Sequence, residues 1–389
     1  MSEYDVIVVG LGAMGSAAAY QLARRGQRVL GIEQFTPAHS FGSSHGGSRI
    51  VRKAYFEKPD YVPLLVRSYQ LWDELSASYG EQLFNRCGAL MIGRPDSPVV
   101  AGALASAQRW NLPYELLDAA AMRARFGQFA VPSDQVAVFE ADAGFVLPEA
   151  AVLASLELAA DAGAELWYDT VVESIELVPG GVELVASGER LTAPRVVIAT
   201  GAWADRLANL DRFPLGVQRQ SVHWFEPDRL TDFGSDRFPV FIWDVPVGAG
   251  EPVAELYGFP CMDGEFSVKA ALYHDGSAAT ANPDTLDRTI HAADHARVSA
   301  LLSATLPDLG GRPPVRSEVC MYPCTPDDDF MLGLHPGSSG RVVLAVGLSG
   351  HGFKFMPVVG EIVADLVVDG STGYEIGFLS PARPMPTTC

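Results

Sequence analysis

The sequence predicts a two-domain α/β protein in which a parallel-sheet domain is interleaved with an antiparallel-sheet domain. A strand, a glycine turn, a helix and a second strand follow one another over residues 4–32, and apolar strands that end in glycine turns recur at 195–201 and 341–352. Between these last two, aromatic-rich alternating segments at 213–273 are typical of an antiparallel sheet. The 389 residues exceed what one hydrophobic core usually organises.

The N-terminal unit is the most regular part of the chain. Residues 4–9 are a β-branched run short enough for a buried parallel strand, and residues 13–25 contain strong helix formers. Gly26 stands where a helix ends, and residues 27–32 form a second buried strand. This βαβ order predicts a Rossmann-like unit.

The later elements follow from the same patterns. Helices are predicted at 61–79, 148–162, 284–302 and 358–368, and strands at 165–168, 171–177, 181–186, 195–201 and 341–346. Because apolar strands that end in glycine turns, the feature typical of nucleotide-binding folds, fall at the start, the middle and the end of the chain, each domain is expected to be discontinuous. The nucleotide-binding domain is expected at 1–85, 150–220 and 315–389, and the substrate domain at 86–149 and 221–314.

Charge and cysteine content limit the expected partners and location. Lys and Arg number 28 against 47 Asp and Glu, and the net charge of −19 disfavours nucleic acid or an anionic membrane surface as a partner. No stretch approaches about 18 uninterrupted apolar residues, so no transmembrane helix is expected. Five cysteines suit a reducing compartment, and the acidic N-terminus is unlike a signal peptide. A cytoplasmic globular protein is therefore expected.

Gly10, Gly12 and Gly15 have the spacing of a dinucleotide-binding turn. The first glycine allows a tight turn, the second lets the backbone approach a pyrophosphate, and the third lets the helix pack against the strand. The helix N-terminus then faces the phosphates with its positive end. Glu33 ends the second strand, where its carboxylate can bind both ribose hydroxyls and would repel the 2′-phosphate of NADP. The motif does not choose between NAD and FAD.

The C-terminal half makes that choice through a resemblance. Residues 320–327, CMYPCTPD, and 350–355, GHGFKF, resemble signature segments of the monomeric sarcosine oxidase and N-methyltryptophan oxidase family. Residues 43–52, SSHGGSRIVR, and 199–203, ATGAW, resemble further segments of the same family. The resemblance extends from the N-terminus to about Pro384 and implies an FAD-dependent amine oxidase of the D-amino-acid-oxidase-like group.

The resemblance also implies how FAD is held. The implied cofactor-binding residues are Gly10, Gly12, Ala13, Met14, Gly15, Glu33, Gln34, Ser43, Ser44, Arg49, Val172, Gly201, Cys320, Gly347, Gly350, His351, Gly352 and Lys354. FAD is expected to be covalently attached through a thioether to Cys320, because a thiolate can add to the 8α-methyl system of an oxidised flavin. From the residues alone, Cys320 and Cys324 are buried core cysteines or half a metal site. No nearby cluster supplies further ligands, so no metal is expected.

The implied chemistry is oxidation of a secondary amine that carries a carboxylate. For an N-methyl amino acid, hydrolysis of the imine gives formaldehyde and the demethylated amino acid, while O2 takes two electrons and becomes hydrogen peroxide. Cyclic or larger substrates such as pipecolate, proline or N-methyltryptophan are the first alternative. An NAD-dependent dehydrogenase and a nucleotide-binding subunit without turnover are more distant alternatives. The family pattern suggests a monomer.

Basic side chains are expected to surround the flavin and the substrate. The resemblance assigns Arg52 and Lys354 to the substrate carboxylate, for which arginine offers a bidentate fork and lysine a point charge. It places Arg49 near the flavin ring. Lys269 alternates within an apolar strand and matches a family lysine that promotes the reaction with O2. An outward-facing strand lysine is the alternative for Lys269.

Histidines and tyrosines complete the expected site. His45 and His274 match the neighbourhood of family active-site histidines, although His274 lies one residue farther along the chain than the family pattern has it. A hydrogen-bonded structural histidine is the alternative for both. Tyr257 and Tyr322 match aromatic residues that line the substrate cavity, and core packing is their alternative. None of the four is expected to act as a general base, because a substrate amine bound in its neutral form needs none.

Overall fold

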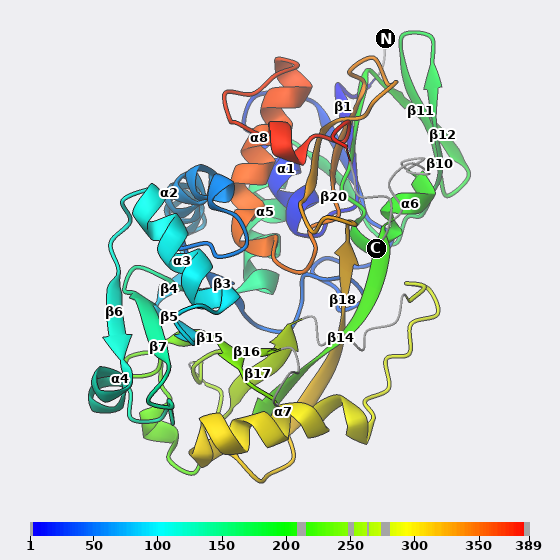
Figure 1. The fold of residues 1–389 in the computed structure, drawn as a ribbon. Coiled ribbons are helices and arrows are strands. Elements are labelled where there is room, and N and C mark those ends of the chain that lie inside the picture. The colour runs from blue at the N-terminus through cyan, green and yellow to red at the C-terminus, as the bar shows by residue number, and fades with distance from the viewer. Residues whose placement is uncertain (1–2, 208–214, 248–252, 263, 274–280, 385–389) are drawn as a thin grey trace.

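The computed structural model describes residues 3–207, 215–247, 253–262, 264–273 and 281–384, and two large sheets organise them (Figure 1). The first is six-stranded, and all of its strands are parallel except β19, which is antiparallel to β20. Its strands, in spatial order, are β19 (Met331–Leu334), β20 (Val342–Val346), β13 (Arg195–Ile198), β1 (Val6–Val9), β2 (Val29–Ile32) and β9 (Glu165–Trp167).

Both faces of this sheet are covered, which explains why its central strands are apolar along their whole length. Val6 and Val8 of β1 face a core formed with helices α1 (Ala13–Ala23), α2 (Val62–Tyr79), α5 (Pro148–Asp161) and α8 (Met356–Val368). Ile7 and Val9 face the opposite way, toward a three-stranded sheet of β10 (Val172–Val178), β11 (Gly181–Ala186) and β12 (Glu189–Ala193). The N-terminal βαβ unit predicted from the sequence is therefore confirmed.

The second large sheet has eight strands and is antiparallel except where β15 pairs with β5. Its order is β18 (Arg316–Cys324), β14 (Gly216–Phe225), β17 (Val268–Tyr273), β16 (Ala254–Gly258), β15 (Val240–Val245), β5 (Ala89–Gly93), β7 (Val136–Glu140) and β6 (Glu115–Asp118). Helices α3 (Pro98–Arg109), α4 (Ala119–Arg125) and α7 (Ala292–Thr305) pack around it, and α6 (Ala204–Leu207) follows β13. The antiparallel region expected from residues 213–273 is present within the described ranges.

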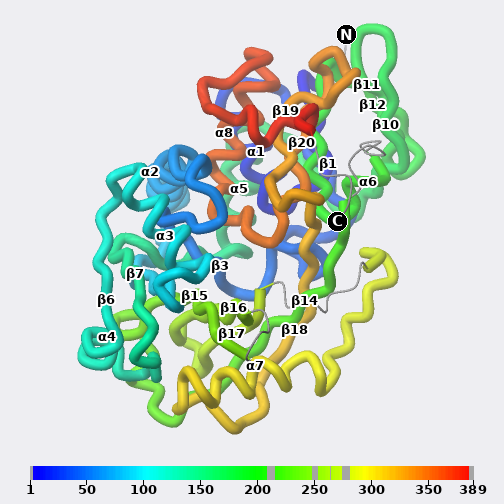
Figure 2. The backbone as a smooth tube through the Cα atoms, viewed as in Figure 1, coloured from blue at the N-terminus to red at the C-terminus, as the bar shows by residue number. Residues whose placement is uncertain are grey.

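The two sheets are linked by long strands and by a small third sheet. Figure 1 shows β14 and β18 running upward from α7 toward the six-stranded sheet, and β18 contacts the turn that follows β13. Figure 2 shows the segment after β2, in blue, passing between the two sheets before it enters β3 (Arg49–Val51). β3 pairs with β8 (Gly144–Val146), which also pairs with β4 (Phe84–Arg86). The domain boundaries given above stay a prediction.

The helix predicted at 284–302 is wrong at its start, since α7 begins only after His291. The Asp287 side chain accepts a hydrogen bond from the Thr289 N–H at 2.9 Å, a local turn that competes with helix formation. His291 and Asp294 then form a capping box that satisfies the first N–H groups of α7. The helix therefore starts at the cap and not at the first helix-forming residue.

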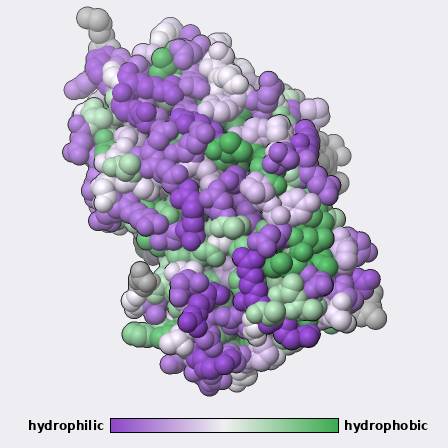
Figure 3. Space-filling view, turned by 90° about the vertical axis from the view of Figure 1, so that its left-hand side faces the viewer, coloured by the Kyte–Doolittle hydropathy of each residue, from purple (hydrophilic) through white to green (hydrophobic). Residues whose placement is uncertain are grey.

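The surface shown in Figure 3 is largely hydrophilic. The face turned to the viewer in Figure 3 is covered mostly by hydrophilic side chains, with smaller apolar areas between them. Among the described residues, no helix combines the length and the apolar character needed to cross a membrane.

Candidate active site

A cavity of about 520 Å³ lies where the carboxyl ends of β1, β2 and β13 meet. In open parallel sheets this edge is where nucleotides bind. Many residues predicted to bind the cofactor line it: Gly10, Gly12, Ala13, Met14, Glu33, Gln34, Ser43, Ser44, Arg49, Val172, Gly201, Gly350 and Gly352. They come from segments far apart in the chain, so the fold brings together residues that the resemblance implied one segment at a time.

The glycines of the first turn are required by close backbone packing. Gly10 has φ of +86°, and a Cβ there would lie 2.7 Å from the Ala199 carbonyl oxygen. A Cβ on Gly15 would lie 1.7 Å from the Gly10 carbonyl oxygen, so Gly15 allows α1 to pack on the strand without lining the cavity. Gly12 is the N-cap of α1 and does line the cavity. The positive end of the α1 dipole is therefore available to a pyrophosphate.

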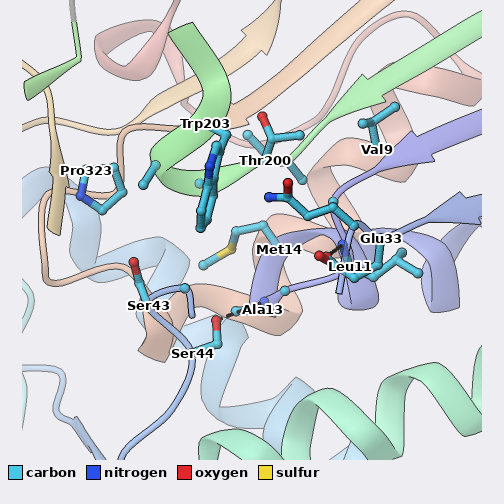
Figure 4. A pocket seen from close by; sticks show the side chains of 18 of the residues that line it. Val9, Leu11, Ala13, Met14, Glu33, Ser43, Ser44, Thr200, Trp203 and Pro323 are labelled. Carbon is cyan, nitrogen blue, oxygen red and sulfur yellow. Dashed lines mark hydrogen bonds between the residues drawn. The ribbon is translucent and has the colours of Figure 1, made fainter. Parts of the chain in front are cut away.

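Glu33 lines the cavity, and two backbone hydrogen bonds fix its carboxylate. Its Oε2 accepts a hydrogen bond from the Leu11 N–H at 2.8 Å, and its Oε1 accepts one from the Phe35 N–H at 3.1 Å. Figure 4 shows Trp203 and Met14 meeting in the middle of the cavity, with Glu33 on one side and Ser43 on the other. A cavity of this volume with a helix N-terminus and a buried carboxylate in its wall fits a dinucleotide such as FAD.

A smaller cavity of about 90 Å³ adjoins the first. Arg49, Tyr322, Gly350 and Phe353 line both cavities, so the two meet at these residues. The smaller cavity is also lined by predicted site residues: Arg52, Tyr257, Lys269, Cys320, His351 and Lys354. The alternation of β16 and β17 explains part of this set, because every second side chain of a strand points to the same face.

Arg52 is buried and already ion-paired. Its Nη2 donates to both carboxylate oxygens of Glu57 at 2.7 Å, its Nη1 donates to the Ala54 carbonyl oxygen at 3.0 Å, and its guanidinium lies 4.1 Å from the Phe56 ring centre. The buried Nε of Arg52 has no hydrogen-bond partner among the described residues. Arg52 therefore keeps one free donor in its present position.

Lys354 is buried in the turn Phe353–Phe355, between the glycine loop and α8. Its Nζ donates to the His351 carbonyl oxygen at 2.7 Å. Burial lowers the pKa of Lys354 to about 7, with Glu57 opposing and Arg52 adding to the shift. His351 is buried as well, and burial lowers its pKa to about 4, so its ring is neutral at neutral pH. The ring bonds to the Tyr55 hydroxyl and to the Asp328 carbonyl oxygen.

Lys269 points inward from β17, and only 2% of it is exposed. Its Nζ donates to the carbonyl oxygens of Gly46 at 2.7 Å and Ser48 at 3.0 Å. Burial lowers the pKa of Lys269 well below its ordinary value, and nearby Arg49 acts in the same direction. The outward-facing alternative is therefore wrong.

Cys320 lies among basic side chains. Burial alone would raise the pKa of its thiol, but His45, Arg49 and Lys269 together hold that pKa below its ordinary value. The pKa of His45 is raised to about 9, because Cys320 and Glu318 outweigh the effect of burial. His45 Nδ1 lies 3.2 Å from Glu318 Oε2. This arrangement favours the thiolate, which is the nucleophilic form of cysteine.

Some predicted residues lie elsewhere. Gly15 and Gly347 line neither cavity, nor does His45, although His45 adjoins Cys320. His274 lies outside the described residues. The hydroxyl oxygens of Tyr257 and Tyr322 lie 3.4 Å apart, and both residues line the smaller cavity.

Sequence reasoning missed the acidic partners of the basic residues. Glu57 pairs with Arg52, Glu318 pairs with His45, and Glu149 binds the loop that holds Lys269. A hint existed only for Glu57, which follows Arg52 by five positions. The other two contacts join segments more than 100 positions apart, which no local pattern reveals.

A dinucleotide cavity at the strand ends that adjoins a smaller cavity lined by basic and acidic side chains suits a nucleotide-dependent oxidoreductase. Comparison with known families shows which class of oxidoreductase this is. The model of the FAD-dependent oxidoreductase family matches residues 5–366. The chain therefore belongs to the FAD-dependent oxidoreductase family.

Individual relatives agree with the family. The monomeric sarcosine oxidase of Streptomyces avermitilis is 45% identical over 382 residues, which cover 98% of this chain and 97% of the relative. The N-methyl-L-tryptophan oxidase of Salmonella heidelberg is 35% identical over 374 residues, covering 96% and 97% of the two chains. Among solved structures, NikD, an amino acid oxidase essential for nikkomycin biosynthesis, has a TM-score of 0.83 at 25% identity and covers 99% of this chain and 100% of its own.

A glycine oxidase from Geobacillus kaustophilus has a TM-score of 0.81 at 22% identity, with 98% of this chain and 99% of the oxidase covered. At that identity the likeness shows the fold alone. The expectation of a Rossmann-like FAD-binding domain interleaved with an antiparallel sheet is confirmed by these neighbours and by the two sheets.

Proposed function

We propose that this protein is an FAD-dependent oxidase of N-methyl amino acids, of the sarcosine oxidase type. The observation that carries the proposal is the meeting of two cavities: a dinucleotide cavity joins a smaller one lined by Arg49, Arg52, Lys269 and Lys354. Glu57 and Glu255 line the same cavity, but Glu57 is paired with Arg52, and burial raises the pKa of Glu255 well above its ordinary value. In a chain with a net charge of −19, the basic side chains therefore still favour an anionic ligand there. The names of its relatives, sarcosine oxidase and N-methyl-L-tryptophan oxidase, support the same substrate class.

Bound FAD would accept two electrons from the carbon next to the substrate nitrogen and pass them to O2. In the balanced reaction, an N-methyl amino acid, O2 and water give the demethylated amino acid, formaldehyde and hydrogen peroxide. The residues of this chain would bind the substrate, orient it and stabilise charge. No general base is assigned, since the amine is oxidised in its neutral form.

The substrate carboxylate is proposed to bind between Lys354 and Arg52. Lys354 supplies a buried ammonium group below pH 7, and Arg52 offers its unpartnered Nε or exchanges Glu57 for the substrate. Tyr257 and Tyr322 form the wall near Arg49, where the flavin ring is expected. Lys269 lines the same cavity as Cys320 and is close enough to interact with it electrostatically. It is proposed to favour the negative charge that develops when O2 accepts electrons.

FAD is proposed to be tethered covalently through Cys320. The thiol is 3% exposed, lines the smaller cavity and has a lowered pKa, so both its position and its ionisation suit addition to a flavin. Cys324 is buried too but lines neither cavity, and it is proposed to be structural.

Pipecolate, proline and N-methyltryptophan remain the alternative substrates. The similarity to the N-methyl-L-tryptophan oxidase of Salmonella heidelberg favours N-methyltryptophan among them. A peroxide assay over sarcosine, N-methyltryptophan, proline, pipecolate and glycine tests the proposal. We expect peroxide with an N-methyl amino acid. Peroxide with only the cyclic amino acids would replace the substrate class, and its absence with every compound would reject the oxidase activity.

A monomeric, cytoplasmic enzyme is proposed as the working form. The four cysteines within the described ranges form no disulfide, which suits a reducing compartment, and the name of the Streptomyces avermitilis relative favours a monomer. The discontinuous division into domains given above is kept as part of this proposal.

A further inference from the structure

The loop that holds Lys269 is itself held from its other side by a carboxylate. Glu149 lies in the first turn of α5, directly after β8, and β8 pairs with β3. This pairing brings Glu149 to the loop that precedes β3. Its Oε1 accepts hydrogen bonds from the Gly46 N–H at 2.6 Å and from the Gly47 N–H at 3.1 Å.

The Gly46–Gly47 peptide unit connects the two sides. Its N–H, from Gly47, bonds to Glu149, and its C=O, from Gly46, accepts from the Lys269 Nζ at 2.7 Å. In a trans peptide the N–H and C=O point in opposite directions, so fixing one fixes the other. Both glycines have positive φ, +94° and +78°, and present successive N–H groups to one anion.

We propose that Glu149 is a positioning residue for the reaction with O2: it aims the Gly46 carbonyl group at Lys269 and thereby helps to fix the ammonium group. Without this carboxylate the two N–H groups would turn toward water or another acceptor, and the carbonyl group of the shared peptide would turn with them. The negative charge of Glu149 also favours the protonated form of Lys269. This inference rests on the role of Lys269 in the proposed function.

The test uses flavin that has been reduced chemically with dithionite, so it does not depend on which amine is the substrate. Reoxidation by O2 is followed by stopped flow in Glu149→Ala, Glu149→Gln and the control Glu157→Gln, which removes the same charge from an exposed position on α5. Loss of hydrogen bonds to a charged group predicts reoxidation about tenfold slower or more in Glu149→Ala. Glu149→Gln keeps an acceptor but loses the charge, so a smaller decrease of about threefold is expected, and the control should match the wild type.

Flavin reduction by substrate should change by less than about twofold in these variants, because the carboxylate site is not touched. A second measurement needs no turnover. Urea unfolding of Glu149→Ala, Lys269→Met and the double variant should depart from additivity by about threefold or more in the unfolding equilibrium constant, since the two residues share one loop. If Glu149→Ala does not fold, the Glu149→Gln reoxidation rate decides.

Unchanged reoxidation in Glu149→Gln would overturn the proposal, and so would additive unfolding effects of Glu149→Ala and Lys269→Met. Equal slowing of reduction and reoxidation would also overturn it, because that pattern indicates general damage. If wild-type flavin is reoxidised rapidly but is not reduced by any N-methyl amino acid, the proposed substrate class fails while the role of Glu149 stands.

Discussion

The buried ammonium group of Lys354 predicts how binding of a carboxylate depends on pH. The experiment measures the affinity for a simple carboxylate at different pH values. A carboxylate without an amine is used, so that only groups of the protein titrate. Burial lowers the pKa of Lys354 from 10.5 to about 7, and the group is therefore charged below pH 7 and loses its proton as pH rises through 7. Affinity should be nearly constant below about pH 6 and should fall above 7.

The magnitude follows from the protonated fraction. With a pKa of about 7, this fraction falls about tenfold per pH unit above that value, so Kd should rise by up to about a hundredfold between about pH 6 and about pH 9. If Arg52 alone still binds the carboxylate, this residual affinity limits how far Kd can rise. Perturbation of the flavin absorbance on titration with the carboxylate measures Kd.

Two variants make the result decisive. Lys354→Met should bind weakly at every pH and lose the dependence, while Lys53→Met, which removes a partly exposed lysine paired with Asp142, should retain it. A Kd that is flat from pH 6 to pH 9 in the wild type would refute the assignment of Lys354 to the carboxylate. If Kd of Lys354→Met rises with pH as it does in the wild type, the titrating group is not Lys354.

Three further predictions concern the flavin and its cavity. Cys320→Ala should release its yellow colour on acid precipitation while Cys324→Ala keeps the colour in the pellet; the reverse result contradicts the proposed tether. Lys269→Met should slow reoxidation of reduced flavin by about a hundredfold, measured by stopped flow, because a buried donor to the developing charge is lost; wild-type reoxidation would remove its role. Gly15→Ala should abolish FAD retention or folding, because the new Cβ would lie 1.7 Å from a carbonyl oxygen, whereas Gly373→Ala, with nothing within 4 Å, should behave as wild type in thermal unfolding.

Local patterns predicted the parts of the fold whose causes are local. The βαβ unit with Gly10, Gly12 and Gly15 could be recognised because strand, turn and helix each need specific residues within a few positions. The start of α7 could not be predicted from helix propensity, because a capping box at His291 determines where that helix begins. Propensity describes the interior of a helix, while side-chain hydrogen bonds set its ends.

The candidate site was predictable as a set of residues but not as an arrangement. The resemblance selected Arg52 and Lys269, yet their present partners, Glu57 and the Gly46–Ser48 loop, depend on contacts made only when the chain folds. Glu149 shows this most clearly, since pairing of β3 with β8 brings it to a loop about a hundred positions away. The electrostatics follow from the same contacts, because pKa values depend on burial and neighbours.

The most direct test of the proposed function is the product balance with sarcosine or the best N-methyl amino acid of the panel. O2 consumed, hydrogen peroxide formed and formaldehyde formed are measured in one reaction. We predict equal amounts of the three, with the demethylated amino acid as the remaining product. Substrate loss without peroxide, or peroxide without formaldehyde, would contradict an N-methyl amino acid oxidase.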